Sequence, residues 1–94
     1  MKVLVIDSNE SLREDLKVAL ESDGYVVFTA SEGSEGLEIF AKELPAIVLV
    51  DLSLTDMDGI EVVKRIKKQD ADAQIIVTSD DLEVDLAIQV LREE

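Results

Sequence analysis

The sequence has no cysteine, no histidine and no tryptophan, and it has a single proline. Without cysteine it has no disulfide, thiolate metal ligand or cysteine nucleophile, and without histidine it lacks the commonest general base. Aromatic residues are 3% of the chain against 47% apolar residues, so the core must be aliphatic. No apolar run is long enough to span a bilayer, and the first residues follow a strand pattern instead of a signal-peptide pattern. We therefore expect a cytoplasmic protein without a membrane segment.

Basic residues are also scarce. Nine lysines and arginines stand against 22 aspartates and glutamates, which gives a net charge of −13. Nucleic acids and anionic membranes bind basic surfaces, so we expect this chain to bind neither directly. The length of 94 residues predicts one small domain, residues 1–94.

Short apolar runs alternate with helical patterns along the chain. The runs predict four buried strands, at Lys2–Ile6, residues 25–29, residues 47–50 and Gln74–Thr78. Between them, apolar residues recur at helical spacing in three segments: Leu12, Leu16, Ala19 and Leu20; Leu37, Phe40, Ala41 and Leu44; Ile60, Val63 and Ile66. Ser8, Asn9 and Ser11 offer N-cap oxygens at the start of the first helix, and the residues from Ser11 to Glu14 fit a capping box.

This order of strands and helices predicts an α/β fold, a three-layer α/β/α open parallel sheet with helices on both faces. The pattern of residues 81–91 is ambiguous, because its apolar residues alternate as in a strand while its place in the series favours a fourth helix. The sequence stops in this pattern without a glycine or asparagine cap. We therefore expect the domain to be incomplete at its C-terminus, truncated after the fourth helix.

Polar side chains follow three of the predicted strands where each strand ends. They are Asp7 and Ser8 after the first strand, Asp51 after the third, and Thr78 at the end of the fourth. Ligands of open α/β sheets bind outside the carboxyl ends of the strands. If these strands are neighbours, the two carboxylates repel, and a hard divalent ion such as Mg²⁺ relieves the repulsion. Asp51 can then attack phosphorus to form an aspartyl phosphate, with the Thr78 hydroxyl donating to a phosphoryl oxygen.

The stretches IDSNESLRE, DLSLTDMDGIE and IIVTS resemble the receiver domain of bacterial two-component response regulators, in the same order along all 94 residues. The resemblance implies a flavodoxin-like sheet in the order 2-1-3-4. It implies that Asp51 accepts a phosphoryl group from a sensor histidine kinase or a phosphotransfer protein. It also implies that Mg²⁺ is bound by Asp7, Asp51 and the backbone carbonyl of Ser53, and that Thr78 is the hydroxyl that binds the phosphoryl group.

Two departures from the family pattern weaken the implied site. Ser8 stands where the family has a second metal-binding acid, and a hydroxyl is a poorer Mg²⁺ ligand than a carboxylate. Capping the first helix is an equally good role for Ser8. This sequence has no counterpart of the family's fifth strand, of its fifth helix or of the lysine that pairs with the phosphoryl group. We therefore expect weak Mg²⁺ binding and impaired phosphorylation.

Two other functions remain open. The run DLSLT resembles the nucleophile motif of haloacid-dehalogenase-type phosphatases, but Ser53 replaces the aspartate that serves as their general acid and base. A pseudo-receiver or an engineered fragment that acts as an oligomerisation module without phosphorylation would account for Ser8 and for the unmatched lysine. Asp56 and Asp58 resemble part of a calcium-binding EF-hand loop, but Leu54 stands where that loop needs an oxygen ligand. Asp58 is better explained as a turn-forming residue before the third helix.

The residues from 74 to 91 also predict self-association. If no fifth strand follows, strand Gln74–Thr78 is an open edge that carries no lysine or proline to block pairing. A helix at residues 81–91 would carry two apolar stripes, of which the sheet can cover one. We therefore expect a homodimer, or a higher symmetric oligomer, held by residues 74–91.

Overall fold

The structure, a computed structural model, describes residues 1–78. Strands and helices alternate along them in the order β1 (Lys2–Ile6), α1 (Glu10–Ser22), β2 (Val26–Ala30), α2 (Gly33–Glu43), β3 (Ile47–Asp51), α3 (Gly59–Gln69) and β4 (Gln74–Thr78). The predicted strands are confirmed, with residues 25–29 shifted by one because the Tyr25 N–H donates to the last turn of α1. The predicted segment at residues 81–91 lies outside the described residues.

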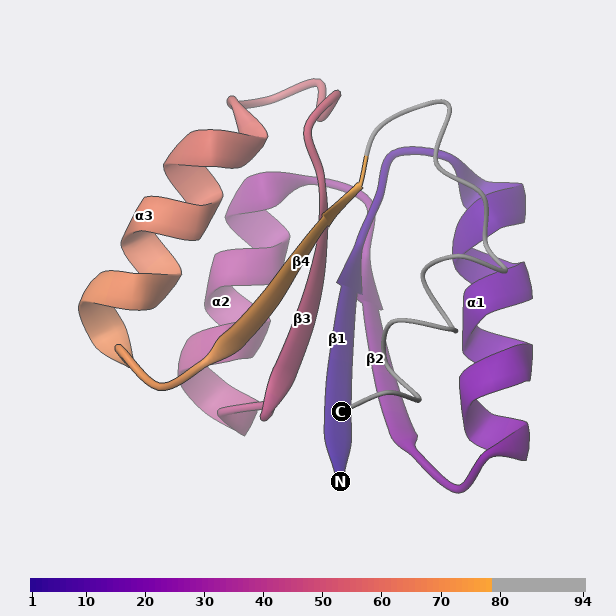
Figure 1. The fold of residues 1–94 in the computed structure, drawn as a ribbon. Helices are drawn as coiled ribbons and strands as arrows, with labels where there is room; N and C mark the ends of the chain where they lie inside the picture. Colours follow the sequence, from indigo (N-terminus) through magenta and orange to yellow (C-terminus); the bar gives the residue numbers. More distant parts are fainter. Residues whose placement is uncertain (79–94) are drawn as a thin grey trace.

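The strands form one parallel sheet in the order β2-β1-β3-β4. Helix α1 covers one face and helices α2 and α3 cover the other, which confirms the predicted three-layer α/β/α fold (Figure 1). The register pairs Ile6 of β1 with Val50 of β3, and Asp51 of β3 with Thr78 of β4. The carboxyl ends of these three strands therefore meet at one edge of the sheet, the upper edge in Figure 1.

Two hydrophobic clusters, aliphatic apart from Phe40, fill the space on the two faces of the sheet. The central strands β1 and β3 are buried on both faces apart from Lys2, so alternate residues of each strand point to opposite clusters. The cluster under α1 contains Val3, Val5, Leu16, Leu20, Val27, Ile47 and Leu49. The cluster under α2 and α3 includes Leu4, Ile6, Phe40, Val48, Val50, Val62 and Ile66. This packing fixes where each strand ends relative to its neighbours, and it therefore places the polar residues that follow the strands.

The capping box predicted from Ser11 to Glu14 is wrong. Helix α1 begins at Glu10, and its N-cap is Asn9, whose side-chain oxygen accepts the N–H of Leu12 at 3.1 Å. Ser11 lies inside the first turn and cannot cap it. Asparagine and serine are equally good caps, so the sequence pattern did not distinguish the two positions.

Three apolar residues assigned to helix faces are exposed instead, Ala41, Leu44 and Ile60. Leu44 lies beyond the end of α2, in the left-handed conformation at φ 48°, and is 64% exposed. Ile60 is 45% exposed, and the buried stripe of α3 runs through Val62 and Ile66. The first turn of α3 packs Gly59 against the end of β3, which directs Ile60 away from the sheet. None of the helices in residues 1–78 has the length and hydrophobicity that crossing a membrane requires.

Candidate functional site

The buried polar residues of the described part of the chain gather at the upper edge of the sheet. They are Asp7, Asp51 and Thr78, with 4%, 4% and 8% of their surface exposed. Asp7 follows β1 directly, Asp51 is the last residue of the neighbouring strand β3, and Thr78 of β4 is paired with Asp51 in register. The sheet therefore brings together the three side chains that the sequence predicted to converge.

The two carboxylates interact unfavourably when both are charged. Burial raises the pKa of the Asp7 carboxyl above its usual range, and the neighbouring Asp51 acts in the same direction. The Asn9 N–H, 2.8 Å from Asp7 Oδ1, and the charge of Arg13 oppose this shift without cancelling it. A bound cation would relieve the repulsion between the carboxylates.

Backbone groups orient one oxygen of each carboxylate. Asp7 Oδ1 accepts the N–H of Asn9, and Asp51 Oδ1 accepts the N–H of Ser53 at 3.0 Å. In both cases the donor lies two residues further along the chain, so the turn after each strand holds the side chain of the strand end. The carboxylates are thus oriented before any ligand binds.

The oxygen donors at this edge suit Mg²⁺. No group of three or more acidic, histidine or cysteine side chains in residues 1–78 is able to hold a metal ion. Two buried carboxylates, Asp7 and Asp51, lie beside Ser8 and Ser53, which are exposed and offer neutral oxygens. Mg²⁺ is commonly bound by one or two carboxylates, with water molecules as its remaining ligands. The two carboxylates at this edge therefore fit Mg²⁺ without further charged ligands from the protein.

Thr78 is placed beside the peptide that follows Val50. Its hydroxyl lies 3.5 Å from the Val50 carbonyl oxygen, which is a long hydrogen bond. The Thr78 carbonyl accepts the N–H of Leu52 at 2.9 Å, so the end of β4 is tied to the residue after Asp51. The hydroxyl is therefore next to Asp51 and only weakly held.

Two further polar residues lie at this edge that the sequence patterns did not assign to it. Arg13 of α1 donates through Nη1 to the Asp7 carbonyl at 2.7 Å. Its position one turn into the helix was the available signal, because helical side chains lean toward the N-terminus. Asp56 accepts the N–H groups of Gly33 and Ser34, at 2.8 and 2.9 Å, and these bonds lower the pKa of its carboxyl. Sequence spacing alone gave no signal for Asp56, since its partners lie 22 and 23 residues away.

Asp58 has the predicted role at the start of α3. Its side chain accepts the N–H of Ile60 at 2.9 Å and caps the helix. The following residue, Gly59, lies so close to β3 that an added Cβ would be 2.6 Å from the Asp51 carbonyl oxygen. Helix α3 therefore begins directly against the residue that carries the candidate reactive carboxylate.

The sequence profile of the response regulator receiver domain matches residues 3–94. The chain belongs to this family. It is 35% identical over 85 residues to sporulation initiation phosphotransferase F of Bacillus subtilis, covering 90% of this chain and 68% of that protein. It is 41% identical over 76 residues to the probable transcriptional regulator ycf27 of Guillardia theta, covering 81% of this chain and 30% of that protein. The chain thus spans about a third of the longer relative.

Solved receiver structures share the fold. The chemotaxis protein CheY4 of Vibrio cholerae superposes with a TM-score of 0.86 at 23% identity, covering 98% of this chain and 96% of that one. The response regulator TrrA of Thermotoga maritima, solved in complex with Mg²⁺-BeF, superposes with a TM-score of 0.79 at 35% identity, covering 83% and 68%. Receiver domains typically bind Mg²⁺ and interact with histidine kinases or phosphotransfer proteins. The receiver interpretation is confirmed, and it replaces the haloacid-dehalogenase alternative.

Proposed function

We propose that Asp51 of this receiver domain accepts a phosphoryl group from a histidine kinase or a phosphotransfer protein, and that Mg²⁺ assists. The observation that carries the proposal is the burial of Asp7 and Asp51 at adjacent strand ends, with Thr78 in register beside Asp51. Receiver domains are in general phosphoacceptors. On this proposal the chain transfers a phosphoryl group to itself and does not turn over other substrates.

The metal ligands proposed are Asp7, Asp51 and the backbone carbonyl of Ser53. Ser8 is a weak additional ligand, because its hydroxyl is uncharged. Mg²⁺ bound there supplies positive charge that neutralises the phosphoryl oxygens and the two carboxylates. The unfavourable contact between Asp7 and Asp51 supports this assignment, because a cation converts it into a favourable one.

The transfer step uses the carboxylate of Asp51 as nucleophile. Because Oδ1 accepts the N–H of Ser53, we assign the attack on phosphorus to Oδ2. A bond forms between this oxygen and phosphorus, the P–N bond of the phosphohistidine breaks, and the imidazole leaves with its electron pair. The hydroxyl of Thr78, weakly held by the Val50 carbonyl, turns to donate to a phosphoryl oxygen.

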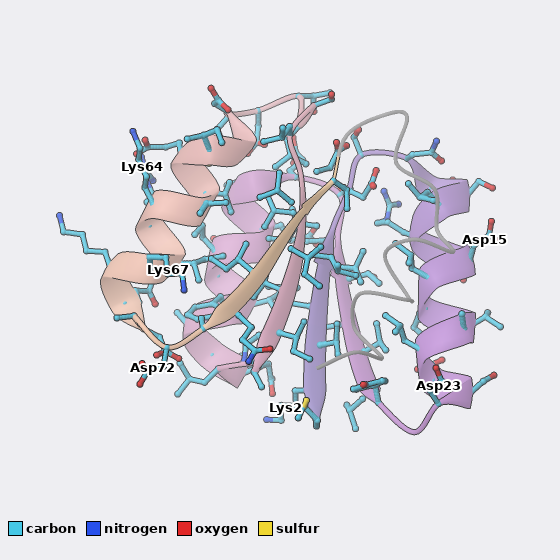
Figure 2. All side chains as sticks on the ribbon, viewed as in Figure 1. Lys2, Asp15, Asp23, Lys64, Lys67 and Asp72 are labelled. Atoms are coloured by element: carbon cyan, nitrogen blue, oxygen red, sulfur yellow. The ribbon has the colours of Figure 1, made fainter. Side chains whose placement is uncertain are left out.

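Intact-mass spectrometry after incubation with acetyl phosphate and Mg²⁺ tests the proposal. We expect slow, substoichiometric formation of one phosphoryl adduct, because Ser8 weakens the metal site. The adduct should be lost in Asp51→Asn and retained in Asp15→Asn, which makes the same change on the outer side of α1 (Figure 2).

An adduct that survives in Asp51→Asn would refute Asp51 as the acceptor. The absence of any adduct on the wild-type chain at saturating Mg²⁺ would favour the alternative that Ser8 suggests, a pseudo-receiver that acts without phosphorylation.

A further inference from the structure

The loop between β3 and α3, residues 52–58, carries Ser53 and therefore one side of the proposed metal site. Its first residue, Leu52, donates its N–H to Thr78, and its last, Asp58, caps α3. Between these ends, Ser53 donates its N–H to the Asp51 side chain of β3, and Asp56 makes the hydrogen bonds that join the loop to α2. Leu54 and Met57 are half-buried against the cluster under α2 and α3. Asp56 thus makes the polar contact between this loop and α2, beside the apolar contacts of Leu54 and Met57.

Asp56 joins this loop to the start of α2. Its Oδ1 accepts the N–H of Gly33 at 2.8 Å, and its Oδ2 accepts the N–H of Ser34 at 2.9 Å. The N-cap residue of α2, Glu32, makes no capping hydrogen bond with its own side chain, so Asp56 supplies the cap from a distant segment. Two bonds fix the plane of the carboxylate, and the positive end of the helix dipole strengthens both.

Helix α2 is in turn fixed to the strand that precedes Asp7. Phe40 of α2 and Ile6 of β1 are both fully buried in the same cluster, and Ile6 is the residue before Asp7. The two halves of the proposed metal site are therefore linked by a short path. Asp7 is connected to β1, β1 packs on α2, and α2 is bound through Asp56 to the loop that carries Ser53.

We propose that Asp56 is a positioning residue for Mg²⁺, which acts by holding the Ser53 carbonyl in place opposite Asp7. Asp56 is exposed, does not touch the metal, and works through the loop it anchors. The inference rests on the proposed function, since it assumes that Ser53 and Asp51 bind the ion. Groups that orient metal ligands commonly change metal affinity by about 10–100-fold when removed, and an exposed clamp belongs at the lower end.

The experiment is a calorimetric titration of the whole chain with Mg²⁺ alone. In Asp56→Ala we expect the Kd for Mg²⁺ to rise about tenfold. Asp56→Asn keeps one acceptor oxygen and should give an intermediate Kd. Adduct formation with acetyl phosphate should slow at low Mg²⁺ and recover at saturating Mg²⁺.

Asp70→Ala is the matched control. It removes the same charge and also one carboxylate bond to a backbone N–H, that of Asp72 at 3.0 Å, but at the opposite end of the sheet. We expect its Kd for Mg²⁺ to change by less than about twofold, because solvent screens distant surface charges. An equal rise in Asp70→Ala and Asp56→Ala would overturn the inference, since charge alone would then explain it.

An unchanged Kd in folded Asp56→Ala would also overturn the inference and leave Asp56 as a helix cap. If Asp56→Ala does not fold, an unchanged Kd for Mg²⁺ in Asp56→Asn would overturn the inference instead. Failure of the proposed function has a separate signature: Mg²⁺ binding that persists at full affinity in Asp51→Asn would show that the ion binds elsewhere.

Discussion

Aspartates lie at both ends of the sheet, and one pair from each end shows how their environments differ. At the carboxyl ends of the strands, Asp7 and Asp51 are almost completely buried. At the amino ends, Asp70 is half-buried and Asp72 is exposed in the loop between α3 and β4 (Figure 2). The lower pair lines a shallow cavity of about 370 Å³. The residue types are the same, so the difference comes from where the fold places them.

The lower end is built to be stable in water. Lys67 donates to the carbonyl oxygens of Ala71 and Ala73, at 3.2 and 2.6 Å, and Asp70 accepts the N–H of Asp72. The loop therefore satisfies its own polar groups at the surface. At the upper end, two neighbouring carboxylates are buried, and a bound cation would relieve the repulsion between them. Burial by the sheet register, more than the presence of acids, distinguishes the candidate site from the solvated end.

Among the predicted variants, glycine substitutions should give the largest difference in stability and Mg²⁺ affinity between the two ends of the sheet. Gly59→Ala forces a methyl group against the Asp51 carbonyl and should destabilise the fold by about 1–3 kcal/mol. Because the clash falls on the backbone of Asp51, Mg²⁺ affinity should fall as well. Urea unfolding and a Mg²⁺ titration measure the two effects.

Gly24→Ala is the control at the lower end. Gly24 has φ +93° and open space around its Cβ position, so alanine should cost about 1 kcal/mol from backbone strain alone. Its Mg²⁺ affinity should be unchanged. A loss of Mg²⁺ affinity in Gly24→Ala equal to that in Gly59→Ala would mean that stability, and not local geometry, sets metal binding.

Local sequence patterns predicted the sheet and the convergence of its polar ends. Lys2–Ile6 and Gln74–Thr78 were predicted with the bounds that the structure shows, because each apolar run has polar or turn-forming residues at its ends. The alternating order then required parallel strands, and parallel strands bring their carboxyl ends to one edge. The burial of Asp7, Asp51 and Thr78 follows from that order without any knowledge of side-chain contacts.

The contacts that join distant segments were not predictable in the same way. The bonds from Gly33 and Ser34 to Asp56 depend on how close α3 and α2 pack, which no local pattern reports. The choice of Asn9 over Ser11 as the cap of α1 depends on where β1 ends. The exposure of Leu44 depends on a left-handed turn that apolar spacing does not reveal.

A carboxylate added at the upper end of the sheet, at the position of Ser8, should increase the affinity for Mg²⁺, whereas one added at the lower end should not. Ser8→Asp places a carboxylate beside Asp7, so we expect the Kd for Mg²⁺ to fall by about tenfold. Ser22→Asp makes the same change at the far end of α1, where an exposed residue should alter the Kd by less than about twofold. Calorimetric titration compares them. Equal effects would show that Ser8 does not face the ion.

Removing the repulsion between Asp7 and Asp51 should have a smaller effect. It should increase the stability of the protein in the absence of Mg²⁺. Because the pKa of Asp7 is raised in the folded protein, the folded state binds this proton more tightly than the unfolded chain does. Ionised Asp7 therefore destabilises the fold at neutral pH, and this cost disappears as the pH falls below the unfolded pKa of about 4. Asp7→Asn should raise the urea midpoint at pH 7 in the presence of a chelator.

The same variant should show little difference from wild type near pH 3, and Mg²⁺ should stabilise the wild type alone. Asp72→Asn, at the solvated end, should leave the midpoint within experimental error at both pH values. A lower midpoint for Asp7→Asn at pH 7 would show that the hydrogen bonds of the carboxylate outweigh its repulsion.

The smallest expected effect concerns the side of the sheet, which belongs to neither end. Within residues 1–78, β4 pairs with β3 alone, and Val77 is 38% exposed. We expect β4 to contribute to a homodimer, because an edge strand without lysine or proline can pair with a second copy. Val77→Lys should raise the dimer dissociation constant by up to about fivefold, the scale of one unfavourable cross-strand pair. Val18→Lys makes the same change on α1, at a residue that is 62% exposed, and should leave the constant unchanged. Light scattering over a concentration series measures both, and a wild-type chain that remains a 10.3 kDa monomer throughout would rule out this association.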